Sequence, residues 1–363
     1  MTGVGSNPGI RTSGGVSKSI ADGGGSCENG CRYPMRATSG LVALFTCCLC
    51  MAQSQIRIDV NQAQAPIRVD VNLVNVAFTV RDRNGALVDD LTKEDLEVFE
   101  DAVPQIITFF ARSADVPLTL GLAVDFSGSQ EHFLKQHHKD LQTFLAAVLG
   151  PRDRAYLVCF GNYLRLVSDF SPSGDSLVDA LQRYEKGRRN FPELGPSEDR
   201  VLGTAFYDAI YYSVTEKLAR AGNDRRAVLV FSDGEDNSSS HNMMEAIEAA
   251  QAADVMVFAL RYTEFGDKGE TARNRYGTGV MARIARETGG VHYDAEKTDL
   301  PTTFRQIGEE LRSSYELAYH TSNPAKDGTF RKIAVRTKRT GLAVRSKTGY
   351  FARASAAGGT GPR

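Results

Sequence analysis

The residues with the clearest chemical potential form a short run in which acidic and hydroxyl side chains alternate. Asp125, Ser127 and Ser129 stand two residues apart, and Gly128 allows the backbone to curl so that all three face one point. They offer only oxygen ligands, which favour Mg²⁺, Mn²⁺ or Ca²⁺ and disfavour zinc or copper. The run therefore predicts a site for a hard divalent cation. Alone, however, Asp125 is equally compatible with a helix cap followed by solvated serines.

Two other segments supply ligands of the same type. Thr204 stands at the start of a helical pattern, and Asp233 with Gly234 ends an apolar run. Taken singly, Thr204 is a helix cap and Asp233-Gly234 is a turn. Because ligands of an open α/β sheet bind beyond the carboxyl ends of its strands, the three segments together predict one metal site at that edge.

The elements that must position these residues alternate between strand and helix patterns. Continuous β-forming runs, typical of strands buried on both faces of a parallel sheet, occupy residues 118–126, 155–160, 227–233 and 255–260. Helical patterns occupy residues 130–149, 174–185, 203–221, 239–253, 278–288 and 300–314. This order predicts an α/β fold with a doubly wound, mostly parallel, Rossmann-like sheet over residues 117–314.

Period-two alternation of apolar and polar residues flanks this region on both sides, at residues 67–114 and 315–353. Isolated hairpins are marginal in water, so we expect the two flanks to pair into one antiparallel β-subdomain. Separate attachment to opposite sides of the α/β region is the alternative. Residues 354–363 are rich in Gly and Ala and predict a flexible tail.

The start of the chain carries a pattern typical of export. Arg36 precedes an apolar run from Leu41 to Ala52, which is too short to cross a bilayer and predicts a signal peptide at residues 35–52. Residues 1–34 then form a disordered or untranslated extension. For the apolar run from Leu41 to Ala52, the alternative is a short buried helix. We expect an exported protein with no transmembrane helix in the mature chain.

Charge and motif content narrow the function further. The 43 Lys and Arg against 44 Asp and Glu leave a net charge of −1, and no dense basic run exists, which argues against nucleic-acid binding. The sequence has no G-x-S-x-G, P-loop or H-E-x-x-H motif. We therefore expect no enzymatic activity, with a metal-assisted hydrolase and an envelope scaffold or assembly protein as the alternatives.

The combined pattern resembles the metal-ion-dependent adhesion site (MIDAS) of the von Willebrand factor type A (VWFA) domain family. The matching residues, in the family's order, are Asp125, Ser127, Ser129, Thr204 and Asp233. The resemblance covers residues 117–314 and implies that the two serines bind the cation directly, as the threonine does in the ligand-bound arrangement, while the aspartates act largely through water. It also implies an open position for an Asp or Glu carboxylate of a partner protein, and hence metal-dependent adhesion. Gln130 departs from the family, which often has Met there, and we expect this to affect packing only.

The flanking sequences resemble those of a narrower group, the secreted bacterial VWFA-related proteins of the acidobacterial type. The stretches VRDRNGALVDDLTKEDLEVFEDAVPQ and SSYELAYHTSNPAKDGTF carry this resemblance. With the central region, it spans about residues 70–353 and informs architecture more than function.

Two long segments, residues 187–200 and 261–279, are predicted to rim the metal site. Arginines beside aromatic residues are common at binding surfaces, and the candidates for partner contact are Arg188, Arg189, Arg261, Tyr262, Arg273, Arg275 and Tyr276. A solvated loop is the alternative, because acidic residues are interspersed. Asp236 and its neighbours are candidates for an auxiliary calcium site or, more simply, a helix cap.

Overall fold

The computed structural model describes residues 73–114, 116–187, 190–196, 203–222, 224–263 and 271–353. The chain divides into two units, Met1–Ile67 and Arg68–Arg363, and every described residue belongs to the second. The expected extension at 1–34, signal peptide at 35–52 and tail at 354–363 lie outside the described residues. None of the helices in the described part of the chain is both long and apolar enough to cross a membrane.

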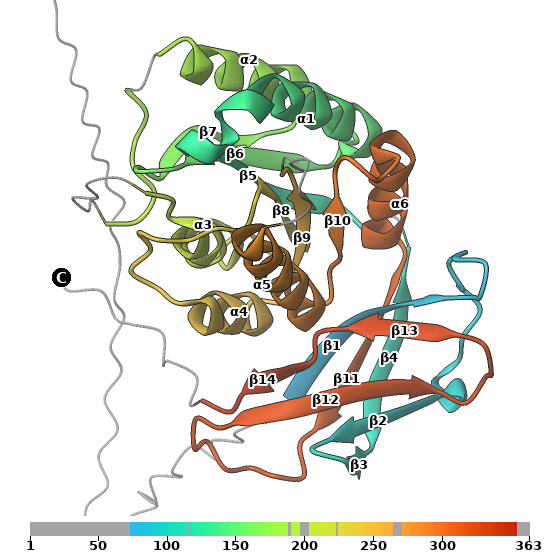
Figure 1. The fold of residues 1–363 in the computed structure, drawn as a ribbon. Helices are drawn as coiled ribbons and strands as arrows, with labels where there is room; N and C mark the ends of the chain where they lie inside the picture. Colours follow the sequence, from blue (N-terminus) through green and yellow to red (C-terminus); the bar gives the residue numbers. More distant parts are fainter. Residues whose placement is uncertain are drawn as a thin grey trace, which may run out of the picture. The chain divides into compact units, whose positions relative to one another are not determined.

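A six-stranded sheet forms the centre of the α/β region, with the strand order β10-β9-β8-β5-β6-β7 (Figure 1). Its strands are β5 (Leu118–Asp125), β6 (Arg154–Phe160), β7 (Arg165–Ser171), β8 (Arg225–Ser232), β9 (Val255–Arg261) and β10 (His292–Asp294). All neighbours run parallel except β6 and β7. The mixed α/β architecture with a mostly parallel sheet is therefore confirmed. The apolar-run pattern misses β7, a half-exposed edge strand, and β10, which has three residues.

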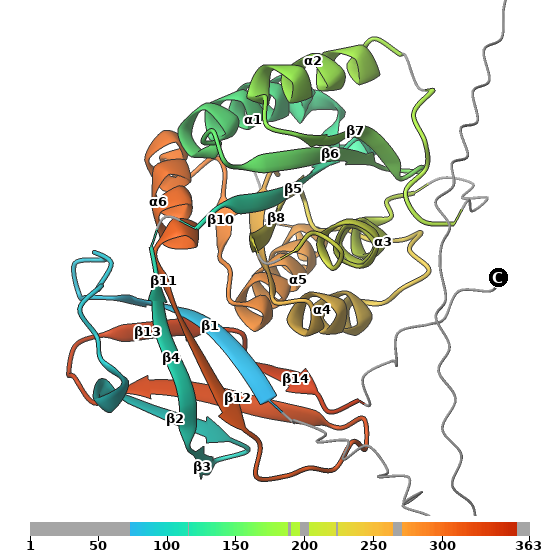
Figure 2. The ribbon, with the colours of Figure 1, turned by 180° about the vertical axis from the view of Figure 1, so that it is seen from behind.

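Helices cover both faces of this sheet (Figures 1 and 2). One face carries α1 (Leu134–Val148), α2 (Gly174–Glu185) and α6 (Leu300–Arg312), and the other carries α3 (Phe206–Tyr212), α4 (Met243–Ala252) and α5 (Ala272–Thr288). A 3₁₀ turn, η2 (Gly128–Phe133), precedes α1, and a π-helix, η3 (Ser213–Leu218), continues α3. Helix α5 begins earlier than its apolar pattern predicts, because the Thr271 hydroxyl caps it by accepting from Asn274 N.

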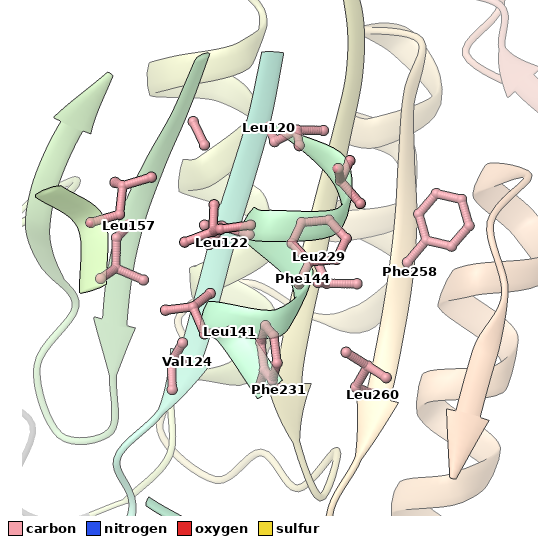
Figure 3. Close-up of a cluster of buried hydrophobic side chains, with 14 of the residues drawn as sticks. Leu120, Leu122, Val124, Leu141, Phe144, Leu157, Leu229, Phe231, Phe258 and Leu260 are labelled. Atoms are coloured by element: carbon pink, nitrogen blue, oxygen red, sulfur yellow. The ribbon is translucent and has the colours of Figure 1, made fainter. Parts of the chain in front are cut away.

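Each face of the sheet has its own hydrophobic core. All eight residues of β5 are buried, as expected for a central parallel strand. Figure 3 shows one core, in which Leu120, Leu122 and Val124 of β5 meet Leu141 and Phe144 of α1. Alternate residues of the same strands pack against α3, α4 and α5 in the other core. This burial holds the carboxyl ends of the strands in a fixed frame.

Strands from both flanks form two antiparallel four-stranded sheets, ordered β13-β1-β11-β4 and β14-β12-β2-β3. Their bounds are β1 (Leu73–Arg81), β2 (Leu96–Glu100), β3 (Val103–Gln105), β4 (Ile107–Ser113), β11 (Ser314–His320), β12 (Phe330–Thr337), β13 (Ala343–Ser346) and β14 (Gly349–Phe351), with a 3₁₀ turn η1 (Lys93–Asp95) before β2. Strand β1 lies between β11 and β13, and β2 pairs with β12. Side chains of both sheets, such as Phe78, Leu317 and Ile333, share one core. Strand pairing thus joins segments that are more than 200 residues apart.

Candidate metal centre

The candidate site lies at the carboxyl ends of two neighbouring strands. Strand β5 stands between β8 and β6, where the direction of strand order changes, and ligands of such sheets bind at this point. Asp125 is the last residue of β5, and Asp233 directly follows the last residue of β8. Since Val124 pairs with Phe231, the two carboxylates emerge side by side on one edge of the sheet.

Asp125 is fully buried beneath this edge. Its Oδ1 accepts from Ser127 N at 2.8 Å, and its Oδ2 accepts from Ser232 Oγ at 2.6 Å. Burial raises the pKa of Asp125 to about 7; the nearby Asp233 carboxylate adds to the rise, and the hydrogen bonds from Ser232 and Ser127 oppose it. The charged form of Asp125 is therefore costly without a neighbouring positive charge.

Two serine hydroxyls connect the β5 loop to Asp233. Ser127 Oγ lies 3.2 Å from Ser129 Oγ, and Ser129 Oγ donates to Asp233 Oδ2 at 2.7 Å. Ser127 is buried whereas Ser129 is exposed, so the cluster opens to solvent at Ser129. In the described part of the chain, neither Asp125 nor Asp233 pairs with a Lys or Arg side chain. The two carboxylates are thus joined through Ser127 and Ser129, and neither has a Lys or Arg counter-charge among the described residues.

Thr204 lies in the loop before α3, and the hydrogen bonds described for it run to Asn237 and Ser238, in the loop after Asp233. Its N–H donates to Asn237 Oδ1 at 2.7 Å, and its carbonyl accepts from Asn237 N at 3.1 Å. Gly203, with a φ of 153°, lies so close to Asn237 that a Cβ would collide with it. On the other side Ala205 N donates to the carbonyl of Gly161, which packs against the backbone of Ser127. Backbone contacts thus place Thr204 between the two aspartate-bearing loops.

Two residues that were not predicted to be part of the site, Ser232 and Gln130, also belong to the cluster. Ser232 donates to Asp125, and its Oγ also accepts from Gly234 N at 3.1 Å. Gln130, 1% exposed, donates through Nε2 to Asp233 Oδ2 at 3.0 Å, so its role is not limited to packing. Ser232 could have been predicted from the sequence because it is a polar residue within the apolar run AVLVFSD. For Gln130, the sequence feature that could have indicated a role is its position directly after the D-x-S-x-S run.

The expected rim is partly wrong. Arg188 and Arg189 lie outside the described residues. Arg261 and Tyr262 are 3% and 1% exposed, so the structure contradicts a surface position for both. Strand β9 extends through Arg261, whose guanidinium pairs with Asp294 of the neighbouring strand at 2.8 Å. Tyr262 turns its hydroxyl inward and donates to Asp140 at 2.8 Å.

The other three rim candidates lie on the exposed side of the first turns of α5. Arg273, Arg275 and Tyr276 are all exposed, and Arg273 pairs with Glu235. A groove of about 240 Å³, lined in part by Arg273, Ser129 and Asp233, runs beside the cluster. Partner contact at these residues stays a prediction.

The donor set is made of oxygens, which suit a hard divalent cation. Among the described residues, no group of three or more His, Cys, Asp or Glu side chains gathers to hold a metal ion. Asp236 accepts from Ser239 Oγ at 2.5 Å and from Tyr207 N at 3.2 Å, which is a capping role for α3. The hydroxyls of Ser127, Ser129 and Thr204 and the two aspartates match the oxygen chemistry that Mg²⁺ prefers.

No family model and no curated protein matches this sequence. Solved structures with a likeness include the BatB protein of Bacteroides thetaiotaomicron, 18% identical with a TM-score of 0.38, covering 52% of this chain and 97% of that one. An aerotolerance-related membrane protein from Bacteroides fragilis is 16% identical with a TM-score of 0.40, covering 53% and 98%. Proximal thread matrix protein 1 of the mussel byssus, with a zinc-occupied MIDAS motif, is 15% identical with a TM-score of 0.37, covering 55% and 49%. At these TM-scores the likenesses carry no argument, and the architecture rests on the strand order described above.

Proposed function

We propose that this protein is a metal-dependent binding module that holds a divalent cation at Asp125, Ser127, Ser129, Thr204 and Asp233. The observation that supports this most is the pair of carboxylates, Asp125 and Asp233, linked through Ser127 and Ser129 without a cationic partner in the described part of the chain. A bound cation would offset the cost of burying Asp125 in its charged form. Mg²⁺ suits this oxygen set best, with Mn²⁺ or Ca²⁺ as substitutes.

The ligand that this site fits is a carboxylate of a partner protein's Asp or Glu. The cation would supply a positive centre with an open position, as the resemblance to the VWFA family implies. Asp125 is sealed beneath the sheet edge, so a ligand would approach from the exposed Ser129 side. The groove past Arg273 leads to that side and has room for the residues next to the carboxylate.

The proposal has three further parts. The order of the five residues supports membership of the VWFA family. The sequence lacks the catalytic motifs of hydrolases, which supports a non-enzymatic role, and the pattern at residues 35–52 supports a location outside the cytoplasm. The module would then act in adhesion or in the assembly of envelope proteins.

The test is calorimetric titration of Mg²⁺ and Mn²⁺ into the chelator-stripped full chain, with and without acetate as a carboxylate probe. We expect saturable binding that acetate tightens. Asp125→Asn should abolish metal binding and yet melt at or above the wild-type temperature without metal, because it removes a buried carboxylate whose pKa is raised.

Asp236→Asn is the matched control for this experiment. Asp236 lies in the loop after Asp233 but accepts hydrogen bonds from Ser239 and Tyr207, so its variant should bind metal like the wild type. Wild-type metal affinity in Asp125→Asn would refute the proposal. So would a folded wild-type chain that binds neither Mg²⁺ nor Mn²⁺, with or without acetate.

A further inference from the structure

A second cleft, of about 500 Å³, lies where the C-terminal end of α5 meets β12 and β13. Helix α5 and the strands are in direct contact there: the chain reverses at Gly289, where a Cβ would lie 3.0 Å from Lys347 N, and Thr348 N donates to Glu287 O at 3.1 Å. Arg273, near the metal centre, and Arg286, in the cleft wall, are separated by 13 residues of α5, or roughly 20 Å. The cleft is therefore separate from the candidate metal centre.

The charges that line this cleft are of one sign. Arg286, Arg345 and Lys347 form part of its wall, whereas no Asp or Glu does so among the described residues that line it. The whole chain carries a net charge of −1, so this separation of charge is local. Val335 and Val344 contribute a nonpolar surface beside the three cations.

Each of these three cations pairs with a carboxylate that is not itself part of the cleft wall. Glu310 pairs with both Arg345 and Arg81. Likewise, Glu287 pairs with both Arg286, at 3.6 Å, and Arg283, at 3.0 Å, while Lys347 pairs with Asp254 at 2.5 Å. Arg345 and Arg286 therefore each share their carboxylate with a second arginine.

Two of the three cations in the wall, Arg286 and Arg345, are arginines. Guanidinium groups pair especially well with the planar or tetrahedral oxygens of carboxylate and phosphate.

We propose that this cleft binds a small organic anion whose carboxylate or phosphate group meets Arg286, Arg345 and Lys347, while its nonpolar part lies against Val335 and Val344. This site is independent of the proposed metal centre and of its partner protein. It gives the region between the α/β sheet and the β-sheets a ligand-binding role of its own.

Calorimetric titration of the full chain with inorganic phosphate and with butyrate tests the proposal, at low salt and at 150 mM NaCl. We expect saturable binding of at least one probe that persists at the higher salt, because a partly buried site is less screened than a surface. Arg286→Ala should weaken this binding at least about fivefold, since it removes one charge-assisted contact. The Arg286 side chain is 66% exposed, so the variant should fold.

Arg283→Ala is the matched control. Arg283 lies one turn earlier on the same helix and pairs with the same Glu287, but it is not part of the cleft wall, so this variant should bind both probes like the wild type. An equal loss in Arg283→Ala and Arg286→Ala would show diffuse attraction to a basic surface and overturn the proposal. If neither phosphate nor butyrate binds, the proposal is also overturned. Binding of only one probe supports it and identifies the head group.

Discussion

Gln130 joins the two loops that carry the candidate metal ligands. Its Nε2 donates to Asp233 Oδ2 at 3.0 Å and to the Tyr262 carbonyl at 3.3 Å, whereas its Oε1 has no partner among the described residues. Leaving a buried acceptor unpaired costs about 1–3 kcal/mol. Gln130 thus orients the Asp233 carboxylate while one of its own polar atoms has no partner in this part of the chain.

We therefore expect Gln130→Met to lower metal affinity with little change in stability. Methionine removes the unpaired Oε1 but also leaves the buried Tyr262 carbonyl without its donor, so the free energy of unfolding without metal should change by less than about 1 kcal/mol. Mg²⁺ affinity should fall about tenfold because Asp233 loses the donor that orients it. Urea denaturation and calorimetry measure the two quantities. Unchanged affinity in Gln130→Met would exclude a positioning role for Gln130.

At the level of elements, helix α5 packs directly on the turn that carries Asp233. A Cβ at Gly277 of α5 would collide with the carbonyl of Asp233, and a Cβ at Gly234, whose φ is 81°, would lie 2.6 Å from the carbonyl of Gly277. Two glycines thus allow a helix backbone to touch the site loop. The position of α5 and the position of Asp233 are coupled by this contact.

Gly277→Ala should push α5 away from the Asp233 turn. Because the obstacle is backbone, we expect a loss of about 2 kcal/mol in the free energy of unfolding and weaker Mg²⁺ binding. Gly279→Ala is the matched control: Gly279 is exposed on the same helix, with no atom within 4 Å of an added Cβ. That variant should instead gain about 0.5–1 kcal/mol and bind metal normally. Equal stability of the two variants, measured by chemical denaturation, would disprove the contact.

At the level of the whole molecule, buried ion pairs connect the β-sheets to the α/β region. Glu310 of α6 is 1% exposed; it pairs with Arg81 of β1 at 2.9 Å and with Arg345 of β13, and accepts from Thr79 at 3.1 Å. Similarly, Arg225 of β8 donates to Glu316 of β11 at 2.8 Å. The two regions belong to one compact unit. They should therefore unfold together.

Glu310→Gln tests this coupling. Removing the charge leaves two arginines without their buried partner, and such a change costs about 3 kcal/mol. We expect one cooperative transition in wild type, shifted to lower denaturant concentration in the variant. Glu309→Gln, an exposed neighbour on the same helix, should have no measurable effect. Two separate transitions in the wild-type protein would show that the regions fold independently.

The pattern of the chain predicted the mostly parallel sheet because its strands are continuous apolar runs, and a strand buried on both faces must be apolar throughout. Edge strand β7 was not predicted because only one of its seven residues is buried, and β10 was not predicted because three residues are too few to form a pattern. Helix boundaries differed where a side-chain cap, such as Thr271, decided the start.

For the candidate site, local periodicity is enough to place Asp125 and Asp233 at the ends of apolar strand runs. That Ser232 and Gln130 reach these carboxylates, and that Arg261 and Tyr262 turn inward, follows from the packing of distant segments and cannot be read from local pattern. Gln130 and Asp233 are 103 residues apart in the chain, and their hydrogen bond depends on strand order and register. The direction of a side chain near a strand end depends on where the strand stops, which neighbouring strands and helices determine through packing.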